Sequence, residues 1–319
     1  MSNIKDIARI AGVSVTTVSR VLNDEPYVSE VKRKAVLNAI ELTNYQRNQN
    51  AVNLSKGKTN LIGVVIPFSQ HPYFGLLIDG IANEAIKNNY KLVLFQSNYE
   101  KKREIEALKM LQLKQIDSLI ICSRICSIEM IENYKQYGQI VLFEDTRNTG
   151  VSSTFIDQYN CFMIALEYLY QKGHRKIGYS IGRRTGKNSK QRESAYIDFH
   201  SKYNESLNND FVFDNCYYFE DGERIVQSLL NLKERPTALL VTSDQVAAGV
   251  QTCCNDRGIA IPHDLAIIGF DNQPIAKVMK LTTVEIPLRE VGKKLFIQAI
   301  NSEINQEEIA IKLIERQTV

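Results

Sequence analysis

The sequence predicts a small all-α head followed by an α/β body of two doubly wound lobes, each built on a parallel sheet. Short amphipathic helical patterns fill residues 4–43, whereas from residue 61 short apolar runs alternate with helical patterns. Continuous apolar runs that alternate with helices are typical of parallel strands buried on both faces. The alternation begins again near residue 158, which predicts two successive units of similar plan.

Composition limits the class of protein. The 319 residues are 44% hydrophobic and 24% charged, as in ordinary soluble proteins of two or three compact units. No apolar run approaches the ~18 residues that a membrane span requires, and the N-terminus has no apolar stretch of the signal-peptide type. We therefore expect a cytoplasmic protein with no membrane partner. The six cysteines show no zinc-ligand spacing, so we expect buried reduced thiols and neither a metal nor a cofactor.

The net charge of +3 conceals an asymmetry between the two ends of the chain. Residues 1–58 carry nine basic and five acidic side chains, so this head has a charge of +4 and the rest of the chain −1. A small basic head on a near-neutral body suggests a polyanionic partner for the head alone. A solvated basic face is the alternative, and charge by itself does not separate the two.

The head is predicted to contain three helices. The first covers residues 4–11 and the second residues 15–22, with Gly12 supplying the positive φ of a tight turn. Ser14 is suited to cap the second helix, and Ser29 to cap a third helix that ends near residue 43. The polar segment that follows has little material for a core and is interpreted as a connector.

The spacing of Ala8, Gly12 and Val18 is the signature of a helix-turn-helix. A small residue lets the helices approach, glycine makes the turn, and a β-branched residue fills the crossing. In this motif the second helix enters the DNA major groove by its N-terminal end. The side chains that would then face base edges and phosphates are Val15, Thr16, Thr17, Ser19 and Arg20. An ordinary helical hairpin is the alternative interpretation.

In the body, the first lobe is predicted to have strands at LIGVVIP, KLVLFQ, SLIICS and IVLFED, with helices at 74–89 and 100–114. The second is predicted to have strands at KIGYSI, CYYF, ALLVTS and LAIIGF, with helices at 158–172, 191–204, 221–232 and 246–257. A last helix is expected near 288–303. The expected domains are 1–46, a linker at 47–59, and a body at 60–319. We assign 60–158 plus 288–319 to the first lobe and 159–287 to the second.

Two enzyme-like motifs are rejected. GYSIG at 178–182 matches G-x-S-x-G, but that nucleophile elbow requires a strand, a sharp turn at the serine and then a helix. Ser180 lies inside the strand pattern and a loop follows it. KGKT at 56–59 resembles the end of a phosphate-binding loop, but Val52 stands where the first glycine is required. We therefore expect no catalytic site.

Several body residues suit ligand binding. Asp244 and Asp271 follow predicted strands, and Arg192 follows the long loop 182–190. Ligands of open α/β sheets bind beyond the carboxyl ends of the strands, and two carboxylates without a metal pattern suit sugar hydroxyls. FSQHPYF at 68–74 adds aromatic and polar groups. Each residue alone could instead be a helix cap or a turn. The basic loop GRRTGKNSKQ also admits an anionic effector such as a sugar phosphate.

Along essentially its whole length the chain resembles the LacI/GalR family of bacterial transcription regulators. The matching stretches include IKDIARIAGVSVTTVSRVLN, YVSEVKRKAVLNAI, RPTALLVTSDQVAAGV, IPHDLAIIGFDN and LTTVEIPLREVGKKL. The resemblance implies a helix-turn-helix head, a hinge helix and a body similar to periplasmic sugar-binding proteins. It also implies a homodimer on a palindromic double-stranded DNA operator, controlled by a small effector that is most often a sugar.

The resemblance also implies roles for individual residues. Base reading falls on Val15, Thr16 and Arg20. Contacts to phosphates, or positioning of the helix, fall on Ser14, Thr17, Ser19, Asn23, Tyr27 and Ser29. The hinge helix falls on residues 48–54, from Asn48 to Leu54, and Leu54 matches a leucine that wedges into the minor groove and bends DNA. Arg47 stands where the family usually has proline. Effector binding falls on Arg192, Asp244 and Asp271, with Ser69, Tyr73, Phe74 and Glu144 as weaker candidates.

These observations predict a sequence-specific DNA-binding transcriptional regulator. We expect a repressor of a carbohydrate-utilisation operon, with maltose-type operons as first candidates, controlled by a small sugar or sugar phosphate. The main alternative is a global catabolite-control regulator governed by a phosphocarrier protein. A transport-linked sugar-binding protein is disfavoured by the head, and a hydrolase would depend on Ser180.

Overall fold

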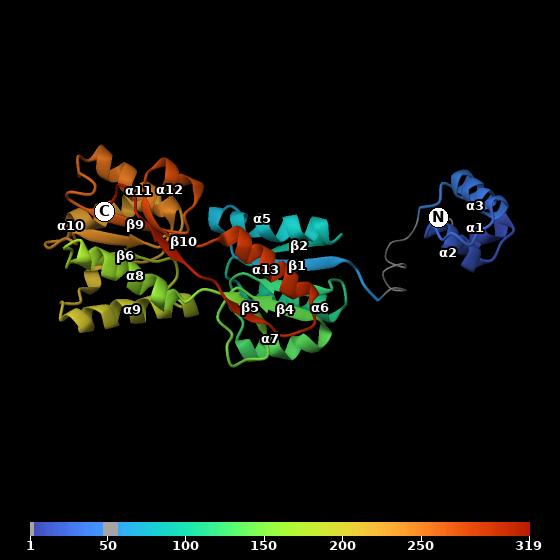
Figure 1. Ribbon diagram of the computed structural model, residues 1–319, viewed down its shortest axis with the longest axis horizontal. Helices are drawn as coiled ribbons and strands as arrows, with labels where there is room; N and C mark the ends of the chain where they lie inside the picture. Colours follow the sequence, from blue (N-terminus) through green and yellow to red (C-terminus); the bar gives the residue numbers. More distant parts are fainter. Residues whose placement is uncertain (1–2, 47–56) are drawn as a thin grey trace. The chain divides into compact units, whose positions relative to one another are not determined.

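The computed structural model describes residues 3–46 and 57–319. The chain divides into two compact units, residues 1–59 and residues 60–319, and each is described by itself (Figure 1). The hinge residues named above, Arg47, Asn48, Val52 and Leu54, lie outside the described residues.

The head unit contains the three predicted helices, α1 (Ile4–Ala11), α2 (Val15–Leu22) and α3 (Glu30–Thr43). Gly12 has a φ of 64°, as the tight turn between α1 and α2 requires. The Ser14 side chain accepts a hydrogen bond from the backbone N–H of Thr17 and so caps α2. Ser29 occupies the corresponding position before α3 but makes no capping hydrogen bond with its side chain.

The head is held together by a small apolar core to which all three helices contribute. Its buried members are Ile7, Ala8, Val18, Val21, Val36 and Ala39. Because α1 and α2 are too short to be stable alone, this shared core is what keeps them folded. It also fixes the rotation of α2, since the buried Val18 and Val21 leave the opposite face of that helix exposed.

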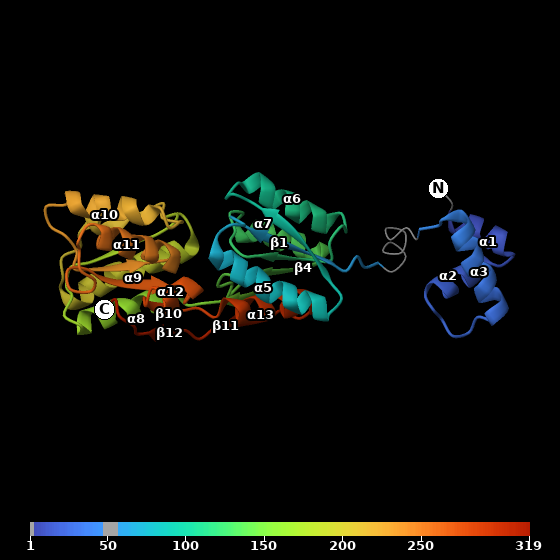
Figure 2. The same cartoon turned by 90° about the horizontal axis from the view of Figure 1, so that it is seen from above.

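The first lobe of the body has a six-stranded, wholly parallel sheet with strand order β11-β5-β4-β3-β1-β2. The strands are β1 (Leu61–Ile66), β2 (Lys91–Gln96), β3 (Ser118–Ile121), β4 (Gln139–Leu142), β5 (Ser152–Phe155) and β11 (Gln306–Glu308). Figure 2 shows α5 (Pro72–Lys87) and α13 (Leu288–Ile300) on one face, and α6 (Lys101–Gln112) and α7 (Ile128–Tyr134) on the other. The lobe is therefore doubly wound, as predicted.

The second lobe repeats this plan around a six-stranded sheet with strand order β12-β10-β9-β8-β6-β7. Its strands are β6 (Ile177–Ser180), β7 (Val212–Phe213), β8 (Ala238–Val241), β9 (Ala266–Phe270), β10 (Thr282–Glu285) and β12 (Lys312–Ile314). Its helices are α8 (Gln158–Gln171), α9 (Lys187–Tyr203), α10 (Asp221–Asn231), α11 (Asp244–Asp256) and the short α12 (Pro274–Val278). The apolar residues of α8 and α9 share one buried cluster, and those of α10 and α11 share another.

The C-terminal tail differs from the expected lobe boundary. Residues 288–319 were all assigned to the first lobe, but β12 pairs antiparallel with β10 in the second sheet. The Thr318 hydroxyl also donates to the carbonyl of Ile267 at 2.7 Å. The tail thus closes the outer edge of the second sheet, and of residues 288–319 only α13 and β11 belong to the first lobe. These edge strands are short and half-exposed, so they lack the apolar runs that revealed the central strands.

The strand predicted at CYYF is also wrong, because β7 lies earlier, at Val212–Phe213. The Asp221 carboxylate accepts the backbone N–H groups of Tyr217 and Tyr218 at 2.7 and 2.9 Å. These two N–H groups are therefore bound within the loop before α10 and are not available to pair with a neighbouring strand. The aromatic residues that suggested a strand instead place their rings against Phe68 of the first lobe.

The helices α5 and α13 cross very closely. A Cβ on Gly80 would lie 2.1 Å from the carbonyl oxygen of Arg289, and one on Gly292 would lie 2.2 Å from that of Leu77.

All six cysteines are free and buried, as expected. Among residues 3–46 and 57–319, no helix has the length and apolar character that crossing a membrane would require.

Candidate functional site

In the head, the predicted DNA-contacting residues lie on the face of α2 and the following loop that the core leaves open. Val15, Thr16, Arg20 and Asn23 are exposed, as is Tyr27 with 89% of its surface accessible. The Arg20 guanidinium lies 3.5 Å from the Glu25 carboxylate, and both side chains are about half exposed. Such a solvated pair is weak, so Arg20 can exchange it for a base or a phosphate.

The loop after α2 is held in place from α3. The Arg33 guanidinium donates to the Asp24 carboxylate and to the carbonyl of Glu25, both at 2.7 Å. This arrangement fixes the segment that carries Asn23 and Tyr27 relative to α2. Ser14, Thr17 and Ser19 surround the exposed side of the helix, with Ser14 and Thr17 also hydrogen-bonded to one another at 2.9 Å.

In the body, one cleft is lined by residues from both lobes. They follow the carboxyl ends of β1, β3 and β4 in the first sheet and of β6, β8 and β9 in the second. This is where ligands of open α/β sheets bind. Of the residues predicted to bind an effector, five line the cleft: Tyr73, Phe74, Glu144, Arg192 and Asp271.

The polar side of the cleft is built around Arg192 and Asp271. Arg192, on α9, donates through Nε to the Gln158 side chain at 2.9 Å. Its two terminal nitrogens make no hydrogen bond to the part of the chain that the structure describes. Asp271 follows β9 with a φ of 95° and accepts from the Gln273 side chain at 3.0 Å. The pair offers donors and an acceptor to a ligand with several hydroxyl groups.

Burial dominates the electrostatics of this pair. It raises the pKa of Asp271 to about 7, although the Gln273 side chain and the Arg192 charge favour the carboxylate. Burial also lowers the pKa of Arg192, against the attraction of Asp271. The phenol of Tyr73 lies near both groups, and burial together with the Asp271 charge raises its pKa. A ligand that donates a hydroxyl to Asp271 would favour its charged form.

Asp244 does not line the cleft, contrary to expectation. It is fully buried behind the β9–α12 loop, where it accepts the Gln273 backbone N–H and the Thr283 hydroxyl, both at 2.7 Å. Burial raises its pKa, and the charge of Asp271 adds to the shift. Its position after a strand was correctly identified, but a strand end does not determine which way a side chain points. Asp244 positions the loop that carries Asp271.

An aromatic wall forms another side of the cleft. Phe68 makes edge contacts with Tyr99, Tyr217 and Tyr218, with centroid distances of 5.3, 5.6 and 6.3 Å. It thereby joins the two lobes. His71, whose pKa is lowered by burial, lies beside Phe74 at 5.8 Å. Tyr99 and Tyr217 were missed as cleft residues, because Tyr99 is a lone tyrosine after a strand and Tyr217 was assigned to a strand at CYYF.

Ser69 is displaced from this wall. It is exposed, and its backbone N–H donates to the Gln96 side chain at 3.0 Å, while its neighbours Phe68 and His71 enter the cleft. The segment 68–74 was correctly placed after the first strand. Of its three expected residues, Tyr73 and Phe74 line the cleft and Ser69 does not.

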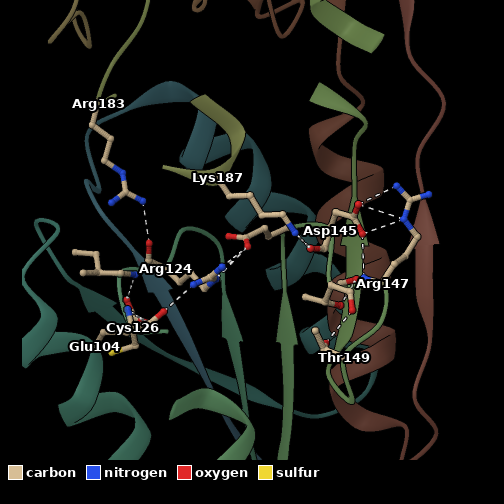
Figure 3. Close-up of polar contacts among 12 residues, drawn as sticks. Glu104, Arg124, Cys126, Asp145, Arg147, Thr149, Arg183 and Lys187 are labelled. Carbon is tan, nitrogen blue, oxygen red and sulfur yellow. Dashed lines mark hydrogen bonds and ion pairs between the residues drawn. The ribbon is translucent and has the colours of Figure 1, made fainter. Parts of the chain in front are cut away.

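Polar contacts join the lobes at the mouth of the cleft (Figure 3). The Arg183 guanidinium donates to the carbonyl of Arg124 at 2.8 Å, and the Lys187 ammonium to that of Asp145 at 2.5 Å. Glu144 lines the cleft but is paired with Arg124, whose Nη2 lies 2.6 Å from its carboxylate. The basic composition of loop 182–191 was the only sequence signal for this arrangement.

A buried carboxyl group supports the first-lobe side of the mouth. Glu104 accepts the backbone N–H groups of Ile125 and Cys126 at 2.7 and 3.2 Å (Figure 3). Burial raises its pKa, although these hydrogen bonds favour the charged form. Glu104 thus fixes the loop that presents the Arg124 carbonyl to Arg183.

Ser180 lies inside β6, as the rejection of a nucleophile elbow requires. Its buried hydroxyl finds no hydrogen-bond partner in residues 3–46 and 57–319, so no base activates it there. The same ranges contain no group of three or more His, Cys, Asp or Glu side chains placed to hold a metal ion.

Comparisons with known proteins agree with this architecture. Residues 3–48 match the family model "Bacterial regulatory proteins, lacI family", and residues 166–319 match "Periplasmic binding protein-like domain". The HTH-type transcriptional regulator YkvZ of Bacillus subtilis (strain 168), itself uncharacterized, is 41% identical over the full length of both chains. Catabolite control protein B of the same organism is 34% identical over 93% of each chain.

Among solved structures, a LacI family transcriptional regulator from Lactobacillus casei with bound sucrose has a TM-score of 0.75. It is 25% identical and covers 81% of this chain and 99% of its own. The family resemblance inferred from the sequence is thus confirmed. The chain belongs to the lacI family of bacterial regulatory proteins and is a DNA-binding transcriptional regulator.

Proposed function

We propose that this protein is a cytoplasmic repressor of a carbohydrate-utilisation operon, that it acts as a homodimer on a palindromic operator, and that a small sugar-like ligand in the body cleft controls it. The observation that carries the proposal is the cleft itself, where Arg192 and Asp271 face an aromatic wall contributed by both lobes. Aromatic faces with a few fixed polar groups suit a ring that carries hydroxyls. The sucrose-bound Lactobacillus casei regulator supports this class of ligand.

DNA recognition would rest on the exposed face of α2. Val15 and Thr16 are small enough to let the helix enter the major groove, and Arg20 can donate two hydrogen bonds to guanine. The remaining candidate residues would contact phosphates, which set affinity and register but carry no sequence information. Asn48 and Leu54 remain a proposal for the minor groove. We propose no catalytic role for any residue.

Ligand control would act through the arrangement of the two lobes. Because the cleft is lined by both, a ligand that contacts both favours the lobe arrangement in which these contacts can form together. It can shift the equilibrium only by the difference in its affinity for the two arrangements. The contacts of Arg183 and Lys187 to first-lobe carbonyls belong to one such arrangement.

A catabolite-control regulator governed by a phosphocarrier protein is the second candidate, favoured by the similarity to Catabolite control protein B. The two candidates differ in what changes operator affinity. In the first it is a cleft ligand, and substitution of Arg192 abolishes the response. In the second it is a protein, and substitution of Arg192 leaves the response intact.

The test uses the full chain. Its operator is selected from random DNA, and thermal unfolding is then followed with a panel of sugars and sugar phosphates. A ligand at a hundredfold excess over its Kd raises the apparent stability by about 2.7 kcal/mol. We expect a stabilising ligand also to change operator affinity in wild type but not in Arg192→Ala. If no operator can be selected, or if the ligand acts equally on Arg192→Ala, the proposal is wrong.

A further inference from the structure

A second hollow adjoins the ligand cleft at its mouth. It shares Glu144, Arg183, Gly186 and Lys187 with the cleft, and Arg124 and Lys190 also line it. Four of these six residues are cationic, so the hollow collects positive charge at the seam between the lobes. Figure 3 shows Arg183 and Lys187 reaching from the second lobe toward first-lobe residues.

Most of this charge is not neutralised. Arg124 is paired with Glu144, but Arg183 and Lys187 donate to backbone carbonyls, which carry no formal charge. The carboxylate of Asp145, whose backbone Lys187 contacts, is held by three contacts to Arg147. Lys190 has no carboxylate within ion-pair distance in the part of the chain that the structure describes. Three cations are therefore left facing one hollow.

The helix that begins there contradicts the usual preference. The N-terminus of a helix carries partial positive charge and free N–H groups, so it favours acidic residues. α9 has none in its first turn, and Gly186 gives it no side-chain cap. Its first four residues instead include Lys187 and Lys190. Such a conflict with local preference is typical of a functional site, and an anion in the hollow would resolve it.

We propose that the cleft ligand is a phosphorylated sugar, whose hydroxyl groups contact Arg192 and Asp271 and whose phosphate occupies the hollow among Arg183, Lys187 and Lys190. This rests on the ligand cleft of the proposed function. A phosphate monoester carries a charge of about −1.5 to −2 near neutral pH. It therefore balances three cations and a helix N-terminus more fully than a ligand with a single carboxylate, of charge −1, would. The free terminal nitrogens of Arg192 remain available to the sugar.

The arrangement also explains how such a ligand would act. Arg183 is held over the Tyr99 ring, 4.2 Å from its centroid, so its position is fixed before the ligand arrives. Phosphate in the hollow would contact second-lobe cations that already bridge to Arg124 and Asp145 of the first lobe. It would therefore favour the arrangement in which these bridges are formed.

The experiment measures thermal stability and calorimetric affinity of the full chain at constant ionic strength. The probes are glucose 6-phosphate, trehalose 6-phosphate, glucose, trehalose and inorganic phosphate, with chloride as the reference. We expect inorganic phosphate to raise the unfolding temperature above chloride, and one or both esters to bind at least tenfold more tightly than their parent sugars. Arg183→Gln and Lys190→Gln should each weaken ester binding about tenfold, as expected for loss of one charge-assisted contact.

Arg184→Gln is the matched control. Arg184 lies in the same loop but is paired with Asp214 at 2.9 Å and lines neither the cleft nor the hollow. It should leave ester affinity unchanged. The proposal is overturned if no phosphate-bearing probe stabilises the protein beyond chloride, or if Arg183→Gln and Lys190→Gln bind as wild type does. Should glucose or trehalose bind while the esters do not, only the phosphate assignment fails and the sugar-responsive function stands.

Discussion

The Asp244 carboxylate accepts the backbone N–H of Gln273 at 2.7 Å, although the two residues are 29 positions apart in the chain. Its other oxygen accepts the Thr283 hydroxyl, also at 2.7 Å. Gln273 in turn donates to Asp271 in the cleft. Asp244, which was expected to contact the ligand, thus supports the loop that places Asp271 in the cleft.

Thr283→Val tests this support. Valine keeps the shape of threonine but removes the donor, so a buried carboxylate oxygen loses its partner. We expect a loss of about 1–3 kcal/mol in the free energy of unfolding, together with weaker cleft binding. Thr237→Val is the control, because Thr237 is exposed and its two hydroxyl contacts, to the His174 ring at 3.0 Å and to the Lys176 carbonyl at 3.4 Å, lie where water can replace them. Denaturant unfolding of both variants would show equal losses if Asp244 had no supporting role.

Arg192→Ala should abolish the response to a cleft ligand and leave operator affinity in its absence unchanged. Arg192 lies in the cleft and contacts Gln158 there, whereas operator recognition belongs to the head. The measurement is operator binding with and without the stabilising ligand. A variant that still responds at the wild-type concentration would contradict the assignment of the cleft.

Asp271→Asn should change how stability depends on pH. Burial raises the pKa of Asp271 in the folded state to about 7 from its ordinary value of 3.8. Between these pH values the folded state therefore holds a proton that the unfolded state has lost. The contribution of Asp271 to the free energy of unfolding is therefore fully present below about pH 4. It is lost as the pH rises to 7, by at most about 4 kcal/mol. Burial also raises the pKa values of Asp244 and Glu104, so these two groups likewise make the folded state less stable as the pH rises.

The difference between wild type and Asp271→Asn isolates this contribution. Denaturant unfolding of both proteins at several pH values between 4 and 8 provides the measurement. We expect the wild type to lose more stability than the variant over this range. Parallel curves would show that the Asp271 carboxyl is not perturbed in the folded protein.

Gly80→Ala and Gly292→Ala should each destabilise the body by about 1–3 kcal/mol or more, because the added methyl group would meet backbone at 2.1 or 2.2 Å and force α5 and α13 apart. Gly75→Ala is a matched control in the same helix. A Cβ at Gly75 would meet nothing within 4 Å, so this change should stabilise by about 0.5–1 kcal/mol. Opposite signs in thermal unfolding are the expected result, and equal effects would contradict the close crossing.

Arg20→Ala should reduce discrimination between operator and random DNA by about 1–3 kcal/mol, the value of a good bidentate contact to guanine. Folding should be unaffected, since the pair with Glu25 is exposed. Arg9→Ala is the control, because the Arg9 side chain is 80% exposed on α1. It should change affinity for all DNA alike, if at all. An unchanged specificity ratio in Arg20→Ala would mean that Arg20 reads no base.

The sequence by itself determined the elements whose burial is uniform. The central strands are continuous apolar runs, and the first two head helices carry their own caps and a turn glycine, so local pattern was enough to locate them. The candidate site was predicted in part for the same reason. Asp271 follows a strand whose end could be located, and parallel strands bring their carboxyl ends to one edge. Arg192 was expected just after loop 182–190, but α9 already begins at Lys187 and places Arg192 in its second turn.

Only the tertiary structure decided what depends on distant partners. Asp244 and Asp271 occupy the same kind of position after a strand, yet Thr283 and Gln273 draw one behind the loop while the other faces the cleft. The tail could join the second sheet only where β10 offered an open edge, and CYYF became a loop because Asp221 took its backbone donors. A local pattern records how much of a segment is buried, whereas the direction of a side chain and the partner of an edge strand are set by contacts between residues far apart in the chain.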